Sequence, residues 1–189
     1  MTEFAGRTAV VTGGGSGMGR ELVRQLVAEA CNIATCDVSP TGLAETQRLC
    51  AAAGLPQGLR VTTHIVDVAD RTQVERFRDE VADRHQTDKI HLLFNNAGIS
   101  GGGSMVTNSR EEWERTFNIC WGGVYNCTRA FLPMLQNAGG LGLFAVYGLD
   151  LGVAGFFAAV AAGFCVYAVL LVRAVFGVKA PEVALAMSS

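Results

Sequence analysis

The chain has 189 residues, of which 50% are hydrophobic and 17% are charged, and its formal net charge is -2. This composition is too apolar for a disordered protein, and the length is sufficient for one well-buried domain. Because lysine and arginine form no cluster, the sequence lacks the basic surface of a nucleic-acid-binding protein, and we expect no nucleic acid among its partners.

Four apolar runs alternate with helical patterns through the first part of the chain. The runs predicted as strands cover residues 7–12, 32–38, 60–68 and 89–96. The segments between them carry apolar residues at spacings of three and four, which predicts a helix after each of the first three runs. Strands that alternate with helices form βαβ units. The sequence therefore predicts an α/β fold, a Rossmann-like doubly wound parallel sheet with right-handed crossovers.

Residues suited to ligand contacts follow each predicted strand. The loop TGGGSGMG spans residues 12–19, Asp37 and Asp67 end the second and third runs, and Asn95, Asn96, Ala97 and Gly98 follow the fourth. In a parallel sheet the ligand lies at the carboxyl ends of the strands. Each feature alone has a simpler interpretation, as a turn or a helix cap. Four of them at four successive strand ends favour one shared binding site.

The chemistry of these residues indicates a dinucleotide. Glycines allow the backbone to approach a pyrophosphate, and the N–H groups at the start of the next helix attract its negative charge. Asp37 lies 18 residues after Gly19, within the range of an acid that binds an adenosine ribose. A carboxylate at this position would repel a 2′-phosphate, so we expect NAD in preference to NADP.

The glycine loop has the spacing T-G-x-x-x-G-x-G, because Met18 stands where G-x-G-x-x-G would require its third glycine. Together with NNAG at 95–98, this spacing resembles the short-chain dehydrogenase/reductase family, and residues 7 to about 138 are similar to its cofactor-binding half. The resemblance implies an NAD(P)-dependent oxidoreductase that moves a hydride between nicotinamide and a small alcohol or carbonyl substrate. A homo-oligomer is compatible with it.

Matching positions in the family imply individual roles. Gly13, Gly17 and Gly19 would hold the pyrophosphate, Asp37 the ribose, Asp67 and Val68 the adenine, and Asn96 to Gly98 would pack behind the cofactor. The complete set of implied cofactor-binding residues is Thr12, Gly13, Ser16, Gly17, Met18, Gly19, Asp37, Asp67, Val68, Asn95, Asn96, Ala97 and Gly98. Asn118 matches the family's catalytic asparagine in a water-linked proton relay. The alternative is a helical asparagine that is bonded locally.

The family's remaining catalytic residues, a Tyr-x-x-x-Lys pair and a serine on the preceding strand, have no match in this chain. The tyrosines beyond Asn118 are Tyr125, Tyr147 and Tyr167, and the residues four positions later are Arg129, Leu151 and Leu171. Lys179 is the one lysine beyond residue 89, and no serine lies between Ser109 and Ser188. Since a proton donor must be positioned and activated for carbonyl chemistry, we predict impaired catalysis. Tyr125 is expected to be a core residue and Arg129 a surface residue.

The chain changes character near residues 139 and 140. Its charged residues after Ala130 are Asp150, Arg173, Lys179 and Glu182. We therefore predict a dinucleotide-binding domain at 1–139 and an apolar, helical segment at 140–189. The stretch 152–172 has 21 uncharged residues, which is more than the roughly 18 that indicate a transmembrane helix. The alternative is a buried helix over the sheet, since the flanking charges would orient a membrane helix with the cofactor domain on the wrong side.

Two interpretations of the whole chain follow. The first is a truncated family member whose catalytic half is replaced by unrelated sequence, for instance through a rearranged coding region. The second is a non-catalytic dinucleotide-binding or membrane-attached protein. The N-terminus MTEFAGR lacks the apolar core of a signal peptide, so a cytoplasmic location is expected, with membrane association as the alternative.

The six cysteines, at positions 31, 36, 50, 120, 127 and 165, have no zinc-site spacing. We therefore predict no metal site and reduced, buried thiols.

Overall fold

A computed structural model describes residues 4–100 and 106–138 of the chain. The elements in these ranges are β1 (Thr8–Thr12), α1 (Gly17–Ala28), β2 (Asn32–Asp37), α2 (Pro40–Ala52), β3 (Val61–Ile65), α3 (Arg71–His85), β4 (Leu92–Phe94), α4 (Arg110–Phe117), the π-helical η1 (Asn118–Gly122) and α5 (Gly123–Asn137). Strands and helices alternate as the apolar runs predict.

The four strands form one parallel sheet with the order β3-β2-β1-β4. The chain moves outward from β1 to β2 and β3 and then returns to place β4 on the other side of β1. This reversal is the topological switch point of a doubly wound sheet, where loops at the carboxyl ends of neighbouring strands diverge. The predicted Rossmann-like sheet is confirmed, and its switch point lies between β1 and β4.

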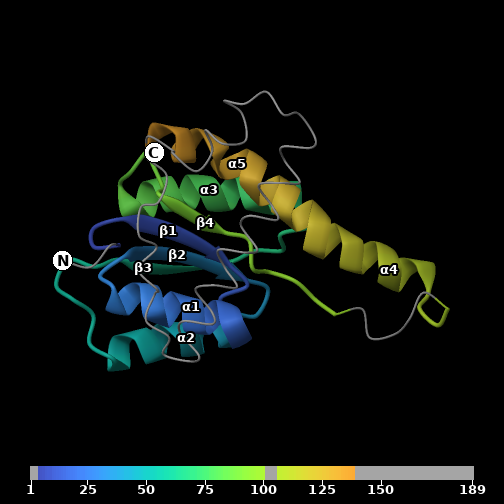
Figure 1. The fold of residues 1–189 in the computed structure, drawn as a ribbon, viewed down its shortest axis with the longest axis horizontal. Coiled ribbons are helices and arrows are strands. Elements are labelled where there is room, and N and C mark those ends of the chain that lie inside the picture. Colours follow the sequence, from blue (N-terminus) through green and yellow to red (C-terminus); the bar gives the residue numbers. More distant parts are fainter. Residues whose placement is uncertain (1–3, 101–105, 139–189) are drawn as a thin grey trace, which may run out of the picture. The chain divides into compact units, whose positions relative to one another are not determined.

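Helices cover both faces of the sheet. Figure 1 shows α1 and α2 on one face and α3 and α5 on the other. Because side chains of a strand alternate between faces, Val11 packs with α1 residues such as Val23, whereas its neighbour Val10 belongs to the cluster that contains Phe77 and Phe131. Two apolar layers therefore hold the sheet between helices.

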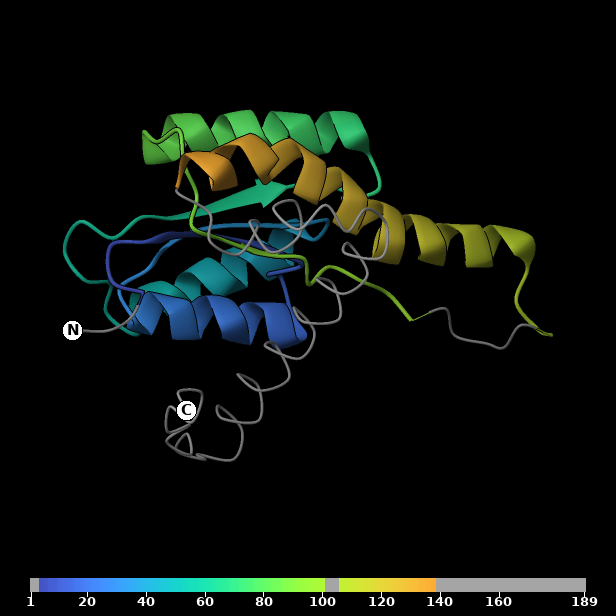
Figure 2. The same ribbon diagram turned by 45° about the horizontal axis from the view of Figure 1, so that its top comes forward.

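The layer of α3 and α5 is fixed by a pair of aromatic rings. Phe77 of α3 and Phe131 of α5 are fully buried, and their rings meet edge to face with centroids 5.3 Å apart. Such a pair adds about 1 kcal/mol to the stabilisation from burial alone. Figure 2 shows the two helices side by side, and this contact anchors α5, which continues the helix that carries Asn118.

β1 and β2 each differ from the predicted runs by one residue, whereas β3 and β4 are several residues shorter, because side chains or turns end the sheet pairing. After β3, the N–H of Asp67 donates to Oε1 of Gln73 at 3.0 Å and is thereby lost to the sheet. After β4, the N–H of Asn96 donates to the carbonyl of Phe94 at 3.0 Å, which turns the chain away from β1. Before β4, the N–H of Ile90 donates to the carbonyl of Met134 in α5.

The described helices include none that is long and apolar enough to cross a membrane. The stretch 152–172 and the predicted boundary at 139 and 140 lie outside the described residues, so both expectations stay predictions. The cysteines of the described part are free, and they are buried except for Cys120, which is exposed. The prediction of buried thiols is therefore wrong for Cys120.

Candidate dinucleotide site

The loop after β1 and the loop after β4 are in direct contact at the switch point. Gly13 adopts a φ of +71°, and a Cβ added there would lie 2.8 Å from Cα of Ala97. A Cβ on Gly19 would collide with the carbonyl oxygen of Gly13 and with the side chain of Asn96. Glycine is therefore required at both positions by packing, because any side chain would separate the two loops.

Thr12 and Asn96 bond the same two loops together. The N–H groups of Asn96 and Ala97 both donate to Oγ1 of Thr12 at 3.0 Å. Nδ2 of Asn96 donates to the carbonyl of Thr12, also at 3.0 Å. Thr12 is 1% exposed. In the structure these two residues therefore hold the floor of the crevice, which agrees with a position behind a ligand.

The start of α1 forms the open side of the glycine loop. Ser16 is the N-cap residue, and Ser16, Gly17 and Met18 are exposed. Ser16 makes no side-chain capping bond, and the first turn contains no acidic residue. Gly17 has a φ of +51°, with no atom within 4 Å of an added Cβ. The first N–H groups of a helix have no intrahelical acceptor, so this end is suited to an anion.

Asp37 lies beside this loop and fixes backbone on both sides of it. Its Oδ2 accepts the N–H of Gly15 at 2.9 Å, and its Oδ1 accepts the N–H of Ser39 at 2.9 Å. The side chain is half-buried. A carboxylate can accept about four hydrogen bonds, so lone pairs remain for the hydroxyls of a ribose.

The structure excludes the simpler interpretation of Asp37 and Asp67 as helix caps. The N-cap residues of α2 and α3 are Ser39 and Asp70, and their side chains accept N–H groups in the first turn of each helix. Asp67 instead accepts the N–H of Ala69 at 2.9 Å, within the turn that follows β3. Asp37 is therefore the last residue of β2 and Asp67 lies in the turn after β3, so both are at strand ends, as the sequence predicts.

Val68 differs from the other candidates because it belongs to the hydrophobic core, with 6% of its surface exposed. A Cβ on Gly123 would lie 2.6 Å from its Cγ2 atom, and Nδ2 of Asn126 donates to its carbonyl at 3.0 Å. The turn after β3 is thus bonded to α5. The side chain of Val68 is not presented on the surface as a ligand contact would be.

The remaining residues of NNAG connect this edge to the long helix. Nδ2 of Asn95 donates to Oγ1 of Thr128 in α5 at 3.1 Å, while its Oδ1 is buried without a hydrogen-bond partner. Gly98 is exposed, and a Cβ there would meet Sγ of Cys120 at 3.5 Å. Asn95 and Gly98 therefore lie between the sheet and the helix.

Asn118 is the first residue of η1 and is exposed. Its carbonyl accepts the N–H of Gly123, five residues later, which is the bond of a π turn. Single π turns inside α-helices often occur at functional sites. The sequence predicts the helix but not this turn. Among the described residues, the structure does not bring the side chain of Asn118 into hydrogen bonding with the glycine loop.

The nearest substitute for a Tyr-x-x-x-Lys pair is on the surface. Tyr125 is 55% exposed, so the prediction of a core tyrosine is wrong. The buried face of α5 passes through Gly123, Cys127, Ala130, Phe131 and Met134. Two residues advance a helix by roughly 200°, so Tyr125 faces away from Cys127 and Gly123. Arg129 is exposed, as predicted.

The buried cysteines beside the site are inert thiols. Cys36 precedes Asp37, and burial raises the pKa of its thiol well above the usual value, with a further contribution from nearby Cys127. Burial also raises the pKa of Cys127 to about 12. Because the thiolate is the reactive form, neither residue supplies a nucleophile near neutral pH.

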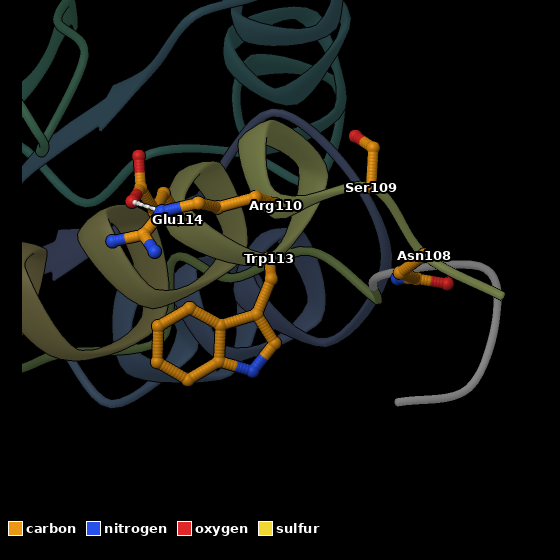
Figure 3. Close-up of a pocket in the computed structure, with 5 residues that line it drawn as sticks. All are labelled: Asn108, Ser109, Arg110, Trp113 and Glu114. Carbon is orange, nitrogen blue, oxygen red and sulfur yellow. Dashed lines mark hydrogen bonds and ion pairs between the residues drawn. The ribbon is translucent and has the colours of Figure 1, made fainter. Parts of the chain in front are cut away.

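A separate hollow lies at the start of α4 and is lined by Asn108, Ser109, Arg110, Trp113 and Glu114. Figure 3 shows the Arg110–Glu114 ion pair, 2.7 Å long, on one side of the helix, with the indole of Trp113 pointing away from it. None of the residues predicted to contact the cofactor lines this hollow. It is a surface feature of α4 and not the candidate site.

Three residues that contact the glycine loop, Arg20, Gly42 and Thr46, were not predicted from the sequence. They belong to α1 and α2, and their contacts join segments more than twenty residues apart, except for the bond from Arg20 to Gly15. Thr46 has one signal in the sequence, since a polar β-branched residue within a helix requires a bonding partner.

Comparison with known proteins agrees with this geometry. A family model described as short chain dehydrogenase matches residues 7–143. The chain is 37% identical over 139 residues to "Putative oxidoreductase SadH" of Mycobacterium tuberculosis, an alignment that covers 74% of this chain and 48% of that protein. The chain thus spans about half the length of the curated relatives it matches.

Solved structures show the same fold. A short-chain dehydrogenase/reductase from Burkholderia phymatum in complex with NAD is 33% identical with a TM-score of 0.65, covering 73% of this chain and 47% of that one. A metagenomic short-chain oxidoreductase in complex with NADP is 26% identical with a TM-score of 0.64, covering 71% of this chain and 59% of that one. With the family match over most of the chain, these findings show that the chain belongs to the short-chain dehydrogenase/reductase family.

Proposed function

We propose that this chain binds a nicotinamide dinucleotide at the crevice between the loops that follow β1 and β4. The observation that carries the proposal is the contact between the two loops, in which Gly13 and Gly19 leave no room for side chains. Family membership supports it, because two structural relatives are complexes with NAD and NADP.

The residues present fit such a cofactor. The pyrophosphate would be held by the start of α1, where Ser16, Gly17 and Met18 are exposed, with Gly19 packed behind them, because backbone N–H groups and the helix dipole favour negative charge there. Thr12, Gly13 and the NNAG residues would form the floor beneath it. Asp67 would border the adenine, and Val68 would support that border from the core.

Asp37 favours NAD over NADP. Its carboxylate accepts two backbone N–H groups and retains acceptor capacity for ribose hydroxyls. A 2′-phosphate at the same place would bring like charges together, which disfavours binding. The nearest basic side chain on α1, Arg20, is directed at the carbonyls of Gly15 and Gly42.

The test is a titration of NADH and NADPH, followed by cofactor fluorescence, with wild-type chain, Asp37→Asn and Asp67→Asn. Asp37→Asn removes the charge and retains the shape. We expect wild type to bind NADH at least tenfold more tightly than NADPH, and Asp37→Asn to reduce that ratio at least fivefold. Asp67→Asn is the matched control, since both cofactors carry the same adenine. An unchanged ratio in Asp37→Asn would remove Asp37 from the ribose site.

We further infer that the chain descends from oxidoreductases that oxidise a small alcohol or reduce a carbonyl, and that its own catalysis is impaired. When bound, the cofactor would donate a hydride in carbonyl reduction and accept one in alcohol oxidation. The protein must donate a proton to the substrate oxygen in the first case and accept one from it in the second, and this chain has neither the serine nor the Tyr-x-x-x-Lys pair that resemblance to the family calls for. Asn118 is the matching residue that remains.

The expectation for catalysis is tested by NAD-linked oxidation of a panel of small alcohols by the purified full chain. We expect turnover near the rate without protein, even when NADH binds. Substantial turnover that disappears in Asn118→Ala would contradict impairment, because it would show a working relay through that residue.

The missing pair also favours a second candidate, a protein that binds the dinucleotide without turnover. This protein could be membrane-attached through residues 152–172, which is testable by fractionating cells that express the full chain. NADH binding confined to the membrane fraction supports attachment, and binding confined to the supernatant contradicts it.

A further inference from the structure

We propose that Arg20 and Thr46 are positioning residues that set the glycine loop in its cofactor-binding form before any cofactor arrives. This inference rests on the proposed binding of a dinucleotide. Gly13, Gly14 and Gly15 are three consecutive glycines, the residues with the most conformational freedom. Ordering them on binding would reduce affinity, so a loop that is already fixed binds more tightly.

The side chains of Arg20 and Thr46 contact consecutive carbonyls of this loop. Oγ1 of Thr46 donates to the carbonyl of Gly14 at 2.7 Å, and Thr46 has no exposed surface. Nη2 of Arg20 donates to the carbonyl of Gly15. Nε of Arg20 donates to Oγ1 of Thr46 at 3.0 Å, so the two side chains form one connected unit, which we call the loop clamp.

The loop clamp determines where the N–H groups of the loop point. In a trans peptide the carbonyl and the following N–H point in opposite directions. Because the Gly14 carbonyl accepts a hydrogen bond from Thr46, the N–H of Gly15 points away from Thr46. It donates there to Oδ2 of Asp37 at 2.9 Å. Because the Gly15 carbonyl accepts a hydrogen bond from Arg20, the N–H of Ser16 points away from Arg20. Neither carbonyl can then turn toward an anion and repel it.

The first turn of α2 completes the loop clamp by close packing. A Cβ on Gly42 would lie 2.6 Å from the carbonyl oxygen of Gly15. Nη2 of Arg20 also donates to the carbonyl of Gly42 at 3.3 Å. The loop is thus held against α2 on one side and against Asp37 on the other, and its three glycines keep one conformation.

The experiment measures the Kd of NADH and the melting temperature for the wild-type chain, four single variants and one double variant. Thr46→Val keeps the volume and removes the hydroxyl, and Thr46→Ser restores the hydroxyl. Arg20→Met keeps the stem and removes the guanidinium. Arg24→Met is the matched control, because Arg24 lies one turn later on α1 and pairs with Glu21 at the surface.

We expect Thr46→Val and Arg20→Met each to weaken NADH binding about tenfold, with Thr46→Ser within twofold of wild type and Arg24→Met unchanged. The variant that carries both Thr46→Val and Arg20→Met should lose less than the product of the single losses, because the two residues act as one unit. Amide exchange of residues 13–17 should accelerate in Thr46→Val.

Wild-type NADH affinity in folded Thr46→Val and Arg20→Met would overturn the inference and leave the proposed function intact. If Thr46→Val does not fold, the NADH affinity of Arg20→Met tests the inference alone. Arg20 is only half-buried, so its replacement is expected to leave the chain folded. A wild-type chain that does not bind NADH would overturn the proposed function and this inference together, so the two failures are distinguishable.

Discussion

The glycine loop and helix α4 differ in what holds them in place. The loop is fixed by hydrogen bonds from three other segments and by packing that excludes any side chain at Gly13 and Gly19. In α4, by contrast, no residue is buried, and the element it packs against in the described residues is its own continuation, η1. Tertiary contacts therefore fix the loop, whereas local interactions hold α4.

The local interactions of α4 are well formed but weak. A capping box joins Ser109 and Glu112, and Arg110 pairs with Glu114. Trp113 and Phe117 stack at 5.3 Å while about half of each side chain is exposed. α4 forms the first eight residues of a helix that continues through η1 and α5, and because it buries no residue it depends on these local bonds and on that continuation. From this contrast we expect the glycine loop, which would hold the cofactor, to be the more rigid side of the candidate site, and α4, which leads to Asn118, to open more easily.

The largest expected effect comes from Gly19→Ala. Helix propensity alone would make this change stabilising by about 1 kcal/mol, because Gly19 lies within α1. The added Cβ would instead collide with the carbonyl of Gly13, so we expect a loss of about 3 kcal/mol in the free energy of unfolding. NADH binding should fall at least a hundredfold. Urea unfolding and NADH titration measure the two effects.

Gly122→Ala is the control for this change, because a Cβ at Gly122 meets nothing within 4 Å. This variant should be as stable as wild type or more stable. Stabilisation by Gly19→Ala to a similar extent would contradict the tight contact between the two loops.

An intermediate loss of folding stability is expected at acidic pH, because His85 at the end of α3 would take up a proton on unfolding. Burial is the largest of the causes that lower the pKa of His85 to about 4, and neighbouring His64 and Arg60 contribute to the same shift. The unfolded chain, with an ordinary histidine pKa near 6.5, binds the proton more readily, so stability is lost as pH falls from about 6.5 toward 4. The slope should approach about 1.4 kcal/mol per pH unit within that window.

Urea unfolding between pH 7.5 and 5.5 checks this prediction, and His85→Gln should flatten the slope. Both tryptophans of the chain, Trp113 and Trp121, lie in α4 and η1. Circular dichroism should follow the packed domain and shift with pH. Tryptophan fluorescence should change at lower urea and shift less, whereas coincident transitions would mean that α4 unfolds together with the loop region.

The smallest change in stability is expected when the serine that caps a helix is replaced. Making this replacement once beside the glycine loop and once in α4 compares the two regions directly. Ser39 caps α2, next to the loop clamp, and Ser109 caps α4. Replacing either serine with alanine should cost its helix about 1 kcal/mol. Ser39→Ala should lower the free energy of unfolding of the whole domain by that amount. Ser109→Ala should leave it within about 0.5 kcal/mol of wild type and should accelerate amide exchange only in α4.

Equal losses of global stability in the two serine variants would show that α4 is part of the cooperative unit. Such a result would remove the contrast between the two regions.

Much of the fold was predictable because its signals are local in the sequence. Runs such as TAVV and NIATCDV are mostly apolar without strict alternation, as expected for strands covered on both faces, and the glycine spacing indicated where the chain turns after β1. The lengths of β3 and β4 were less predictable, since Gln73 and the turn at Asn96 end them through side-chain and backbone bonds that no apolar pattern encodes.

The position of the candidate residues at the strand ends was predictable from the sequence, and their contacts were less so. Asp37 was expected to contact a ribose, and the structure adds that it holds the N–H of Gly15. Tyr125 was expected in the core and is exposed, because the buried face of α5 starts two residues earlier, at Gly123. The π turn at Asn118 depends on a hydrogen bond five residues along the helix, which residue types alone do not specify.

The sequence by itself determined the alternation of strands and helices, the parallel sheet and the glycine positions, because apolar periodicity and backbone freedom are properties of neighbouring residues. Only the tertiary structure decided that Arg20 and Thr46 clamp the loop and that Val68 is buried beneath α5. These contacts join residues that are mostly more than twenty positions apart. Their partners are chosen by how the layers pack, and packing exists only once the chain has folded.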